Sequence, residues 1–174
     1  DGKEIIYGQI IQLEHKSTNK MVQARDDSHS QVGQASLVID KEGGKKCWFK
    51  IMPGNKDIQE GQAVKPTDKV LLLNVNTEGY LHQSQTIDTN GYYSTDVAET
   101  PTIWIMKHSD MGGSSRSVVR FNEPIRLFHN VTGYITADKD YTTVIAKFYH
   151  GGQNERISSY KSVWVVEQCS TESS

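Results

Sequence analysis

The sequence lacks the features that mark membrane-embedded and disulfide-built proteins. No apolar run approaches the length of a membrane span, and no helical periodicity extends over a useful length. The chain has only two cysteines, Cys47 and Cys169. A domain of 174 residues can bury enough core to fold without a disulfide. Two free thiols are therefore the favoured interpretation, and a Cys47–Cys169 bridge is the alternative.

The sequence also has no strong excess of positive or negative charge. The formal net charge is −2 and 23% of the residues are charged, which gives no electrostatic reason to expect binding to nucleic acid or to an anionic membrane. No signal peptide is visible at the start of the chain. Because the first residue is not methionine, we expect the sequence to be a segment of a larger protein.

Motifs of catalysis and metal binding are absent as well. The six histidines show no HxxxH or HExxH spacing, and there is no CxxC pair for zinc. Neither a G-x-S-x-G nucleophile elbow nor a glycine-rich phosphate loop occurs. We therefore expect a protein that is not an enzyme and that needs no metal or cofactor.

What the sequence does contain is a threefold internal repeat. A pattern of strand, short polar turn and strand occurs three times, with nearly equal steps from Ile11 to Val70 and from Val70 to Ile125. Three sets of residues correspond: Ile11, Val70 and Ile125; Leu13, Leu72 and Leu127; His15, Asn74 and His129. The two sets of aliphatic residues are predicted to form a threefold core.

The three tryptophans give a second marker of the period. Trp48, Trp104 and Trp164 follow one another at nearly the same spacing as the strand pattern, and the chain has no other tryptophan. A buried tryptophan covers a large area and its N–H needs an acceptor. One such residue in each repeat predicts that all three lie at equivalent buried sites, with Leu13, Leu72 and Leu127 in the same core.

These patterns predict an all-β fold. About four short strands in each of three repeats make about twelve strands, and a closed barrel hides the edges of such a sheet. Threefold symmetry with two hairpins in each unit indicates a β-trefoil. We expect one domain over residues 1–170, with repeats at about 5–60, 61–117 and 118–169, followed by a tail at 171–174.

The polar residues of the repeat are predicted to be structural. A position that accepts either histidine (His15, His129) or asparagine (Asn74) suits a hydrogen-bonded strand end better than a metal ligand. Residues 130–132 form an N-glycosylation sequon at Asn130. Because this sequon lies in the turn of a repeat, its asparagine and threonine also serve turn chemistry.

The repeat resembles the MIR repeat, which is shared by protein O-mannosyltransferases, stromal-cell-derived-factor-type proteins of the endoplasmic reticulum and intracellular calcium-release channels. The last group is the most similar. Residues 7–20 (YGQIIQLEHKSTNK) resemble the opening of a repeat in inositol trisphosphate receptors. Residues 47–53 (CWFKIMP) resemble a segment of those receptors and of ryanodine receptors. Residues 61–64, 68–70, 80–82, 106–110 and 126–129 continue the resemblance in order.

The resemblance implies a non-catalytic β-trefoil on the cytosolic face of the endoplasmic reticulum membrane. Such a domain would transmit contacts with other domains or subunits of a calcium-release channel to the gate, and is not itself inserted in the membrane. It also implies a phosphate-binding loop, whose place is held here by Lys147, Tyr149, His150, Gly151, Gly152, Gln153 and Arg156. The glycine of that loop is kept, but its hydroxyl pair and its arginine are not. A second, helical domain supplies most of the cations for an inositol phosphate in the family, and these 174 residues do not contain one.

Two classes of function stay open at this point. The first is the regulatory domain of a calcium-release channel. The second is a MIR protein or mannosyltransferase domain in the lumen of the endoplasmic reticulum, which would bind peptide or carbohydrate. A glycan on Asn130 or a Cys47–Cys169 bridge would favour the second.

Overall fold

The computed structural model describes residues 2–25, 34–87, 92–109, 117–137, 145–147 and 159–169. Each repeat contributes a first and a last strand to a barrel. The first strands are β1 (Ile10–His15), β5 (Val70–Asn74) and β9 (Pro124–His129). The last strands are β4 (Phe49–Pro53), β8 (Ile105–His108) and β12 (Trp164–Gln168).

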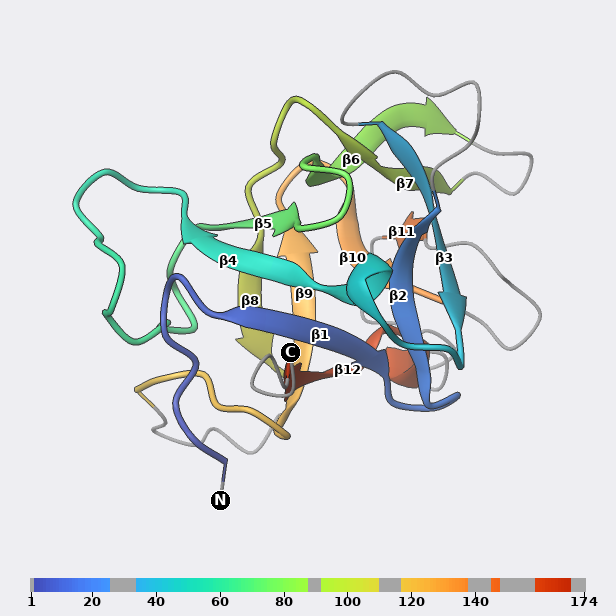
Figure 1. Ribbon diagram of the computed structural model, residues 1–174. Coiled ribbons are helices and arrows are strands. Elements are labelled where there is room, and N and C mark those ends of the chain that lie inside the picture. Colours follow the sequence, from blue (N-terminus) through green and yellow to red (C-terminus); the bar gives the residue numbers. More distant parts are fainter. Residues whose placement is uncertain are drawn as a thin grey trace.

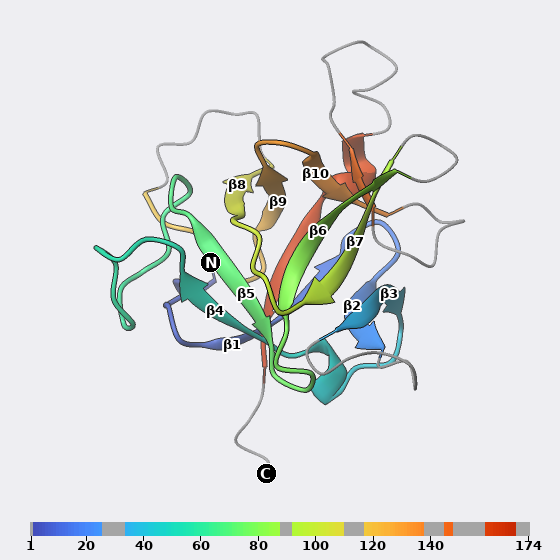
Figure 2. The ribbon, with the colours of Figure 1, turned by 90° about the horizontal axis from the view of Figure 1, so that it is seen from above.

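These strands close into a barrel. β1 pairs with β4 and with β12, β4 pairs with β5, and β9 pairs with both β8 and β12. The remaining seam is bridged by Val70 and Trp104, whose backbone N–H groups each donate to the carbonyl of the other at 2.8 and 2.9 Å. Figure 2, seen from above, shows how the strands surround the core. A closed ring leaves no barrel edge unpaired.

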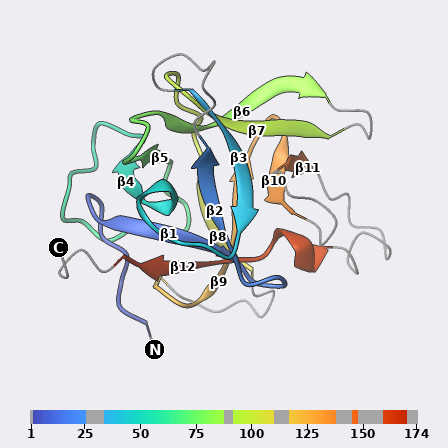
Figure 3. The ribbon, with the colours of Figure 1, turned by 45° about the vertical axis from the view of Figure 1, so that its right-hand side comes forward.

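The second and third strands of each repeat form three hairpins at one end of the barrel. They are β2 (Lys20–Arg25) with β3 (Ala35–Asp40), β6 (Tyr80–Ile87) with β7 (Tyr93–Ala98), and β10 (Gly133–Thr136) with β11 (Ile145–Lys147). In Figure 1 these hairpins lie together toward the right, and Figure 3 turns this side of the molecule forward. β7 pairs with both β3 and β11, so the hairpins form a continuous cap.

A six-strand barrel capped by three hairpins is the β-trefoil that the repeats predict, with twelve strands among the described residues. Two short 3₁₀ helices, Lys45–Cys47 and Ser159–Ser162, precede the last strands of the first and third repeats. Within the described part of the chain, no helix has the length and apolar character needed to cross a membrane.

Alternating residues of the barrel strands fill the core. Along β1, for example, residues 11, 13 and 15 are buried while 10, 12 and 14 are only partly covered. Leu13, Leu72 and Leu127, which were expected in the core, are each at most 1% exposed. This alternation is the physical consequence of the two-residue period of a strand.

The expected equivalence of the three tryptophans is wrong at one position. Trp104 and Trp164 are fully buried, whereas Trp48 is only half-buried. The strand register shows why: Trp164 pairs with His15, and the corresponding partner of Asn74 is Phe49. Because successive side chains of a strand point to opposite faces, a shift of one residue moves Trp48 out of the core and Phe49 into it. Phe49 is 0% exposed.

The exchange of tryptophan for phenylalanine is consistent with the hydrogen bonds of the core. Trp104 donates its indole N–H to the carbonyl of Leu81 at 3.1 Å, and Trp164 donates to the carbonyl of Ile135 at 3.0 Å. Phe49 carries no donor and needs no such acceptor. The Nε1 atom of Trp48 is covered but has no hydrogen-bond partner in the structure.

A ring of three hydrogen bonds closes the end of the barrel opposite the hairpins. Ile5 donates its N–H to the carbonyl of Val119 at 3.0 Å, Val119 donates to Val64 at 2.8 Å, and Val64 donates back to Ile5 at 2.8 Å. All three residues are fully buried, and each stands six positions before the first core residue of its repeat. This ring ties the segments that enter the three repeats to one another.

The turn after the first strand of each repeat contains a residue in the left-handed region. These residues are Asn19 (φ 57°), Glu78 (φ 62°) and Gly133 (φ 99°), each four positions after His15, Asn74 or His129. Asparagine and glycine tolerate this conformation, while glutamate does so at a cost. The pseudo-threefold symmetry thus extends to single backbone angles.

Candidate functional site

Two cavities lie where one repeat meets the next. The first, called here the Ile103 cavity, has a volume of about 410 Å³ and is lined by Lys69, His82, Gln83, Pro101, Thr102, Ile103, Ile105, Phe128, His129 and Asn130. The second, called here the Tyr160 cavity, has a volume of about 510 Å³ and is lined by Lys16, Ser17, Ser109, Pro124, Arg126, Tyr160 and Val163. Both are large enough for a small ligand or a few side chains.

The two cavities occupy equivalent places in the repeat. Ile103 and Val163 each precede the buried tryptophan of their repeat, and Asn130 and Lys16 each follow the histidine at the end of a first strand. Trp48 stands at the third equivalent position, immediately before Phe49. The cavities therefore arise from the repeat itself, and what distinguishes them is the side chains that line them.

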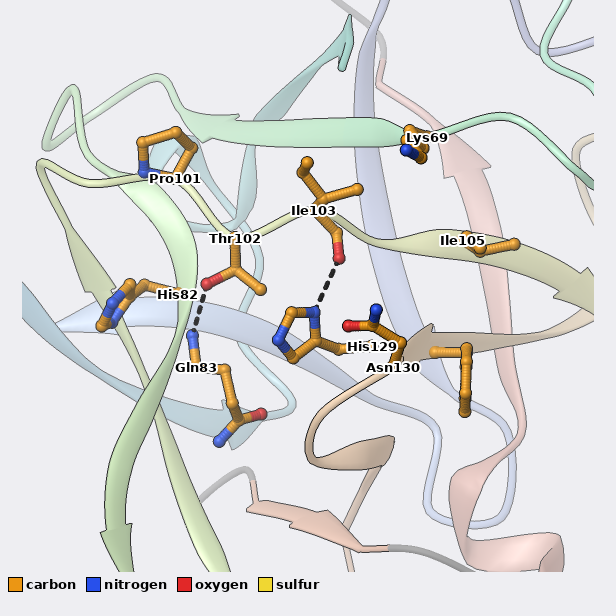
Figure 4. Close-up of a pocket in the computed structure, with 10 residues that line it drawn as sticks. Lys69, His82, Gln83, Pro101, Thr102, Ile103, Ile105, His129 and Asn130 are labelled. Carbon is orange, nitrogen blue, oxygen red and sulfur yellow. Dashed lines mark hydrogen bonds between the residues drawn. The ribbon is translucent and has the colours of Figure 1, made fainter. Parts of the chain in front are cut away.

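Hydrogen bonds fix the polar wall of the Ile103 cavity. The Nδ1 atom of His129 lies 3.0 Å from the carbonyl oxygen of Ile103, and this oxygen can only accept, so Nδ1 donates (Figure 4). The hydroxyl of Thr102 accepts the backbone N–H of Gln83 at 2.9 Å. His82 donates from Nδ1 to the carboxylate of Asp96 at 2.8 Å. Both histidine rings are thus held in one orientation.

The predicted scaffold role of the histidines and of Asn74 is confirmed by their bonds to backbone carbonyls. His15 is fully buried and donates from Nε2 to Lys161 at 2.6 Å, while its Nδ1 accepts from Thr18 at 2.8 Å. Asn74 is also fully buried and donates to Lys46 at 3.0 Å. His129 makes its bond to Ile103 but remains partly exposed, so this member of the set also lines a cavity.

The aromatic ring that lines the Ile103 cavity, Phe128, already contacts two other side chains. The ammonium of Lys107 lies 4.0 Å from the centre of the Phe128 ring. The same ring packs against Tyr134 with the ring centres 5.0 Å apart. Phe128 therefore contributes to the cavity an aromatic ring that a cation and a second ring already contact.

The Tyr160 cavity is cationic and rich in hydroxyl groups. Lys16 and Arg126 supply the charges, and Ser17, Ser109 and Tyr160 supply hydroxyl groups. The guanidinium of Arg126 donates to the hydroxyl of Ser162, which is fully buried. This bond restrains a guanidinium group that lines the cavity.

The predicted phosphate-binding loop is outside the part of the chain that the structure describes. Of its residues only Lys147 is placed, as the last residue of β11, with its backbone paired to Tyr134. Tyr149, His150, Gly151, Gly152, Gln153 and Arg156 lie outside the described residues. That hypothesis therefore stays a prediction.

Both cysteines are free and buried. Burial, and to a lesser extent the negative charge of Asp40, raises the pKa of the Cys47 thiol to about 11. Burial also raises the pKa of Cys169. Neutral thiols in a covered position are poor nucleophiles and poor metal ligands. Among the described residues no cluster of histidine, cysteine and acidic side chains could hold a metal ion.

Sequence reasoning missed both cavities. Lys69, Ile103 and Asn130 are distant in the chain and meet only because the barrel closes. The signal was present in the repeat alignment: residues flanking the core positions of one repeat must meet those of the next. Such an alignment predicts the place of a cavity but not whether side chains fill it.

Comparison with known proteins identifies the family. Residues 1–115 match the family model described as inositol 1,4,5-trisphosphate/ryanodine receptor. The chain is 35% identical over 144 residues to inositol 1,4,5-trisphosphate receptor-like protein A of Dictyostelium discoideum, a match that covers 82% of this chain and 4% of that relative. The chain thus spans a small part of the length of this relative.

Solved structures agree on the fold. The protein O-mannosyltransferase Pmt1-Pmt2 complex of S. cerevisiae, bound to the sugar donor, matches 96% of this chain with 25% of its own, at a TM-score of 0.73 and 16% identity. The designed threefold symmetric protein ThreeFoil matches 92% of this chain with 99% of its own, at a TM-score of 0.60 and 13% identity. These likenesses show the β-trefoil fold. Because the family model matches residues 1–115 of 174, the chain belongs to the inositol 1,4,5-trisphosphate/ryanodine receptor family.

Proposed function

We propose that this chain is a non-catalytic regulatory domain of an intracellular calcium-release channel. The observation that carries the proposal is the family match over residues 1–115, supported by the 35% identity to a receptor-like protein. In this role residues 1–170 form one MIR-type unit at the cytosolic face of the endoplasmic reticulum. The repeats run at about 5–60, 61–117 and 118–169.

The structure supports an interaction role through its rigidity. A closed barrel, a hydrogen-bonded ring at one end and a continuous cap at the other leave few ways for the described core to rearrange. Contacts at the surface of such a body are transmitted by moving it as a unit. A partner or neighbouring subunit that binds one gating state more tightly would then shift the balance between closed and open channel.

Calcium release from the full-length parent polypeptide tests this proposal. The wild-type protein and a deletion of residues 2–169 are expressed in cells lacking endogenous release channels, and release is measured against the concentration of inositol 1,4,5-trisphosphate and of calcium. We expect the deletion to reach the same membrane and to shift the half-maximal agonist concentration by about five-fold or more. Unchanged release by a correctly located deletion protein would overturn the proposal.

The exposure of Asn130 is the observation that favours the lumenal alternative. This residue of the sequon is exposed in the turn between β9 and β10, where a glycan has access. An enzyme that removes N-glycans and a protease-protection assay on microsomes distinguish the two. A glycan on Asn130 together with full protection from protease would place the domain in the lumen and overturn the channel proposal.

A further inference from the structure

Apolar side chains are unusually accessible around the Ile103 cavity. Ile103 is 42% exposed, and Val131, the residue after Asn130 of the lining, is 62% exposed. Pro101, also in the lining, is exposed. Single exposed apolar residues are common, but Ile103 and Pro101 both line one concave volume of about 410 Å³. Such a cavity suits one or two inserted side chains.

The charge at this cavity has one sign. Lys69 is exposed and makes no ion pair within the described part of the chain. His82 is balanced by its bond to Asp96, and none of the described residues that line the cavity is acidic. An occupant with a carboxylate near Lys69 would therefore meet a complementary charge, while the carboxylate of Asp96 is engaged by His82.

Two other occupants fit the cavity less well. A sugar ring is usually held by an open aromatic face and by acidic acceptors for its hydroxyls, but the Phe128 ring is engaged by Lys107 and Tyr134 and the lining has no acid. A membrane surface needs several cations on a flat or convex face. The Ile103 cavity is concave and offers one unpaired lysine in the described structure.

We propose that the Ile103 cavity docks an acidic segment of a partner polypeptide, with an apolar side chain against Ile103 and a carboxylate beside Lys69. The bond to the Ile103 carbonyl fixes the orientation of the His129 ring, which lines the cavity beside Ile103. The proposal deepens the interaction role proposed above by naming the kind of partner. It is tested on the chain alone, so its failure leaves the calcium-release experiment unaffected.

The test uses two short fluorescein-labelled peptides. One carries a leucine pair flanked by glutamates, and the matched control carries glutamines in place of the glutamates. Fluorescence anisotropy is measured with the 174-residue chain and with the variants Lys69→Glu, Ile103→Ser and Lys41→Glu. Lys41 is exposed after β3 and serves as the matched charge control. Circular dichroism melting curves confirm that each variant is folded.

We expect the glutamate peptide to bind and the glutamine peptide to bind at least about tenfold more weakly. Lys69→Glu and Ile103→Ser should each weaken binding by about tenfold, and Lys41→Glu by less than about twofold. Equal loss for Lys69→Glu and Lys41→Glu, equal binding of the two peptides, or no binding at all would overturn the proposal. Binding of phosphatidylserine vesicles that Lys69→Glu abolishes would assign the site to membranes and overturn it as well.

Discussion

At the scale of single residues, Trp48 and Phe49 show how the barrel wall separates neighbours in the chain. Phe49 is fully buried opposite Asn74, whereas Trp48 is half-buried and its backbone carbonyl accepts the N–H of Val75 at 2.9 Å. The larger aromatic residue is the one outside the core. Residue size alone therefore does not decide which side chain packs inside, because the register of β4 with β5 has already fixed the faces.

Alanine substitutions of these aromatic residues should distinguish those packed in the core from the one outside it by the loss of stability. Trp104→Ala and Phe49→Ala remove fully buried aromatic rings and are expected to lower the free energy of unfolding by about 3–5 kcal/mol each. Trp48→Ala removes a half-buried ring and should cost only about 1–2 kcal/mol. Urea unfolding followed by circular dichroism measures all three. Equal costs at positions 48 and 49 would contradict the assignment of faces.

A carboxyl pair on the outer face of the barrel makes stability depend on pH. Glu14 and Glu167 lie diagonally across β1 and β12, since Glu14 is opposite Val165 and Gln12 is opposite Glu167. A hydrogen bond to Glu14, together with partial burial, raises the pKa of Glu167 to about 7 from an ordinary 4.5. Between pH 4.5 and 7 the folded chain therefore holds a proton that the unfolded chain has lost. The free energy of unfolding falls as the pH rises through this window.

Glu167→Gln removes this dependence. The variant should melt at a higher temperature than the wild type at pH 8, and the difference should shrink as the pH falls toward 5. Glu42→Gln, at an exposed position, serves as the control and should show no such trend. Melting curves of the wild type and the two variants between pH 5 and pH 8 measure this dependence. A wild-type chain that becomes more stable relative to Glu167→Gln as the pH rises would show that the sign is wrong.

At the scale of elements, the end of each first strand is anchored to the segment that enters a last strand. Asn74 bonds the carbonyl of Lys46 and accepts from the backbone and the hydroxyl of Thr77, at 2.9 and 3.1 Å. His15 likewise donates to the carbonyl of Lys161 and accepts from the hydroxyl of Thr18. One polar side chain in each case fixes both a turn and the approach of a neighbouring strand.

Exchange between these equivalent positions tests the shared role. Asn74→Ala removes a fully buried polar side chain together with its hydrogen bonds to Lys46 and Thr77, and should cost about 2–4 kcal/mol. Asn74→His introduces the side chain that His15 carries at the equivalent place, so it should recover part of that loss. The measurement is again the free energy of unfolding in urea. A histidine variant less stable than the alanine variant would mean that the two turns are not equivalent.

At the scale of the whole molecule, part of the architecture was predictable from sequence and part was not. The spacing of Leu13, Leu72 and Leu127 predicts a threefold core because strands alternate with a period of two and the repeats recur. The ring of Ile5, Val64 and Val119 was missed because these residues lie outside regular strands, so no alternation of buried and exposed residues marks them, although they recur once in each repeat. The Ile103 cavity was missed because its walls come from segments that meet only after closure. The local sequence pattern thus predicts the repeat, whereas the surfaces between repeats form only when the barrel closes.

Closure also determines what the molecule offers to a highly charged ligand. Of the Ile103 and Tyr160 cavities, the Tyr160 cavity is the one lined by a lysine and an arginine, Lys16 and Arg126. The loop that resembles the family's phosphate-binding loop has Lys147 and Arg156 as its flanking cations. Inositol 1,4,5-trisphosphate carries three phosphate groups, and desolvating each is costly unless several cationic donors converge on it.

The chain alone is therefore expected to bind inositol 1,4,5-trisphosphate more weakly than about 0.1 mM, a binding free energy of no more than roughly 5–6 kcal/mol. Two cations at either place leave at least one phosphate group to be stripped of water without a partner. Titration calorimetry at moderate salt measures the affinity, with Lys147→Ala and Arg156→Ala testing the loop and Lys16→Ala testing the cavity. A sub-micromolar dissociation constant that either loop variant abolishes would contradict the prediction. In that case the loop would be a complete site, able to neutralise the ligand without the helical domain that the family resemblance implies.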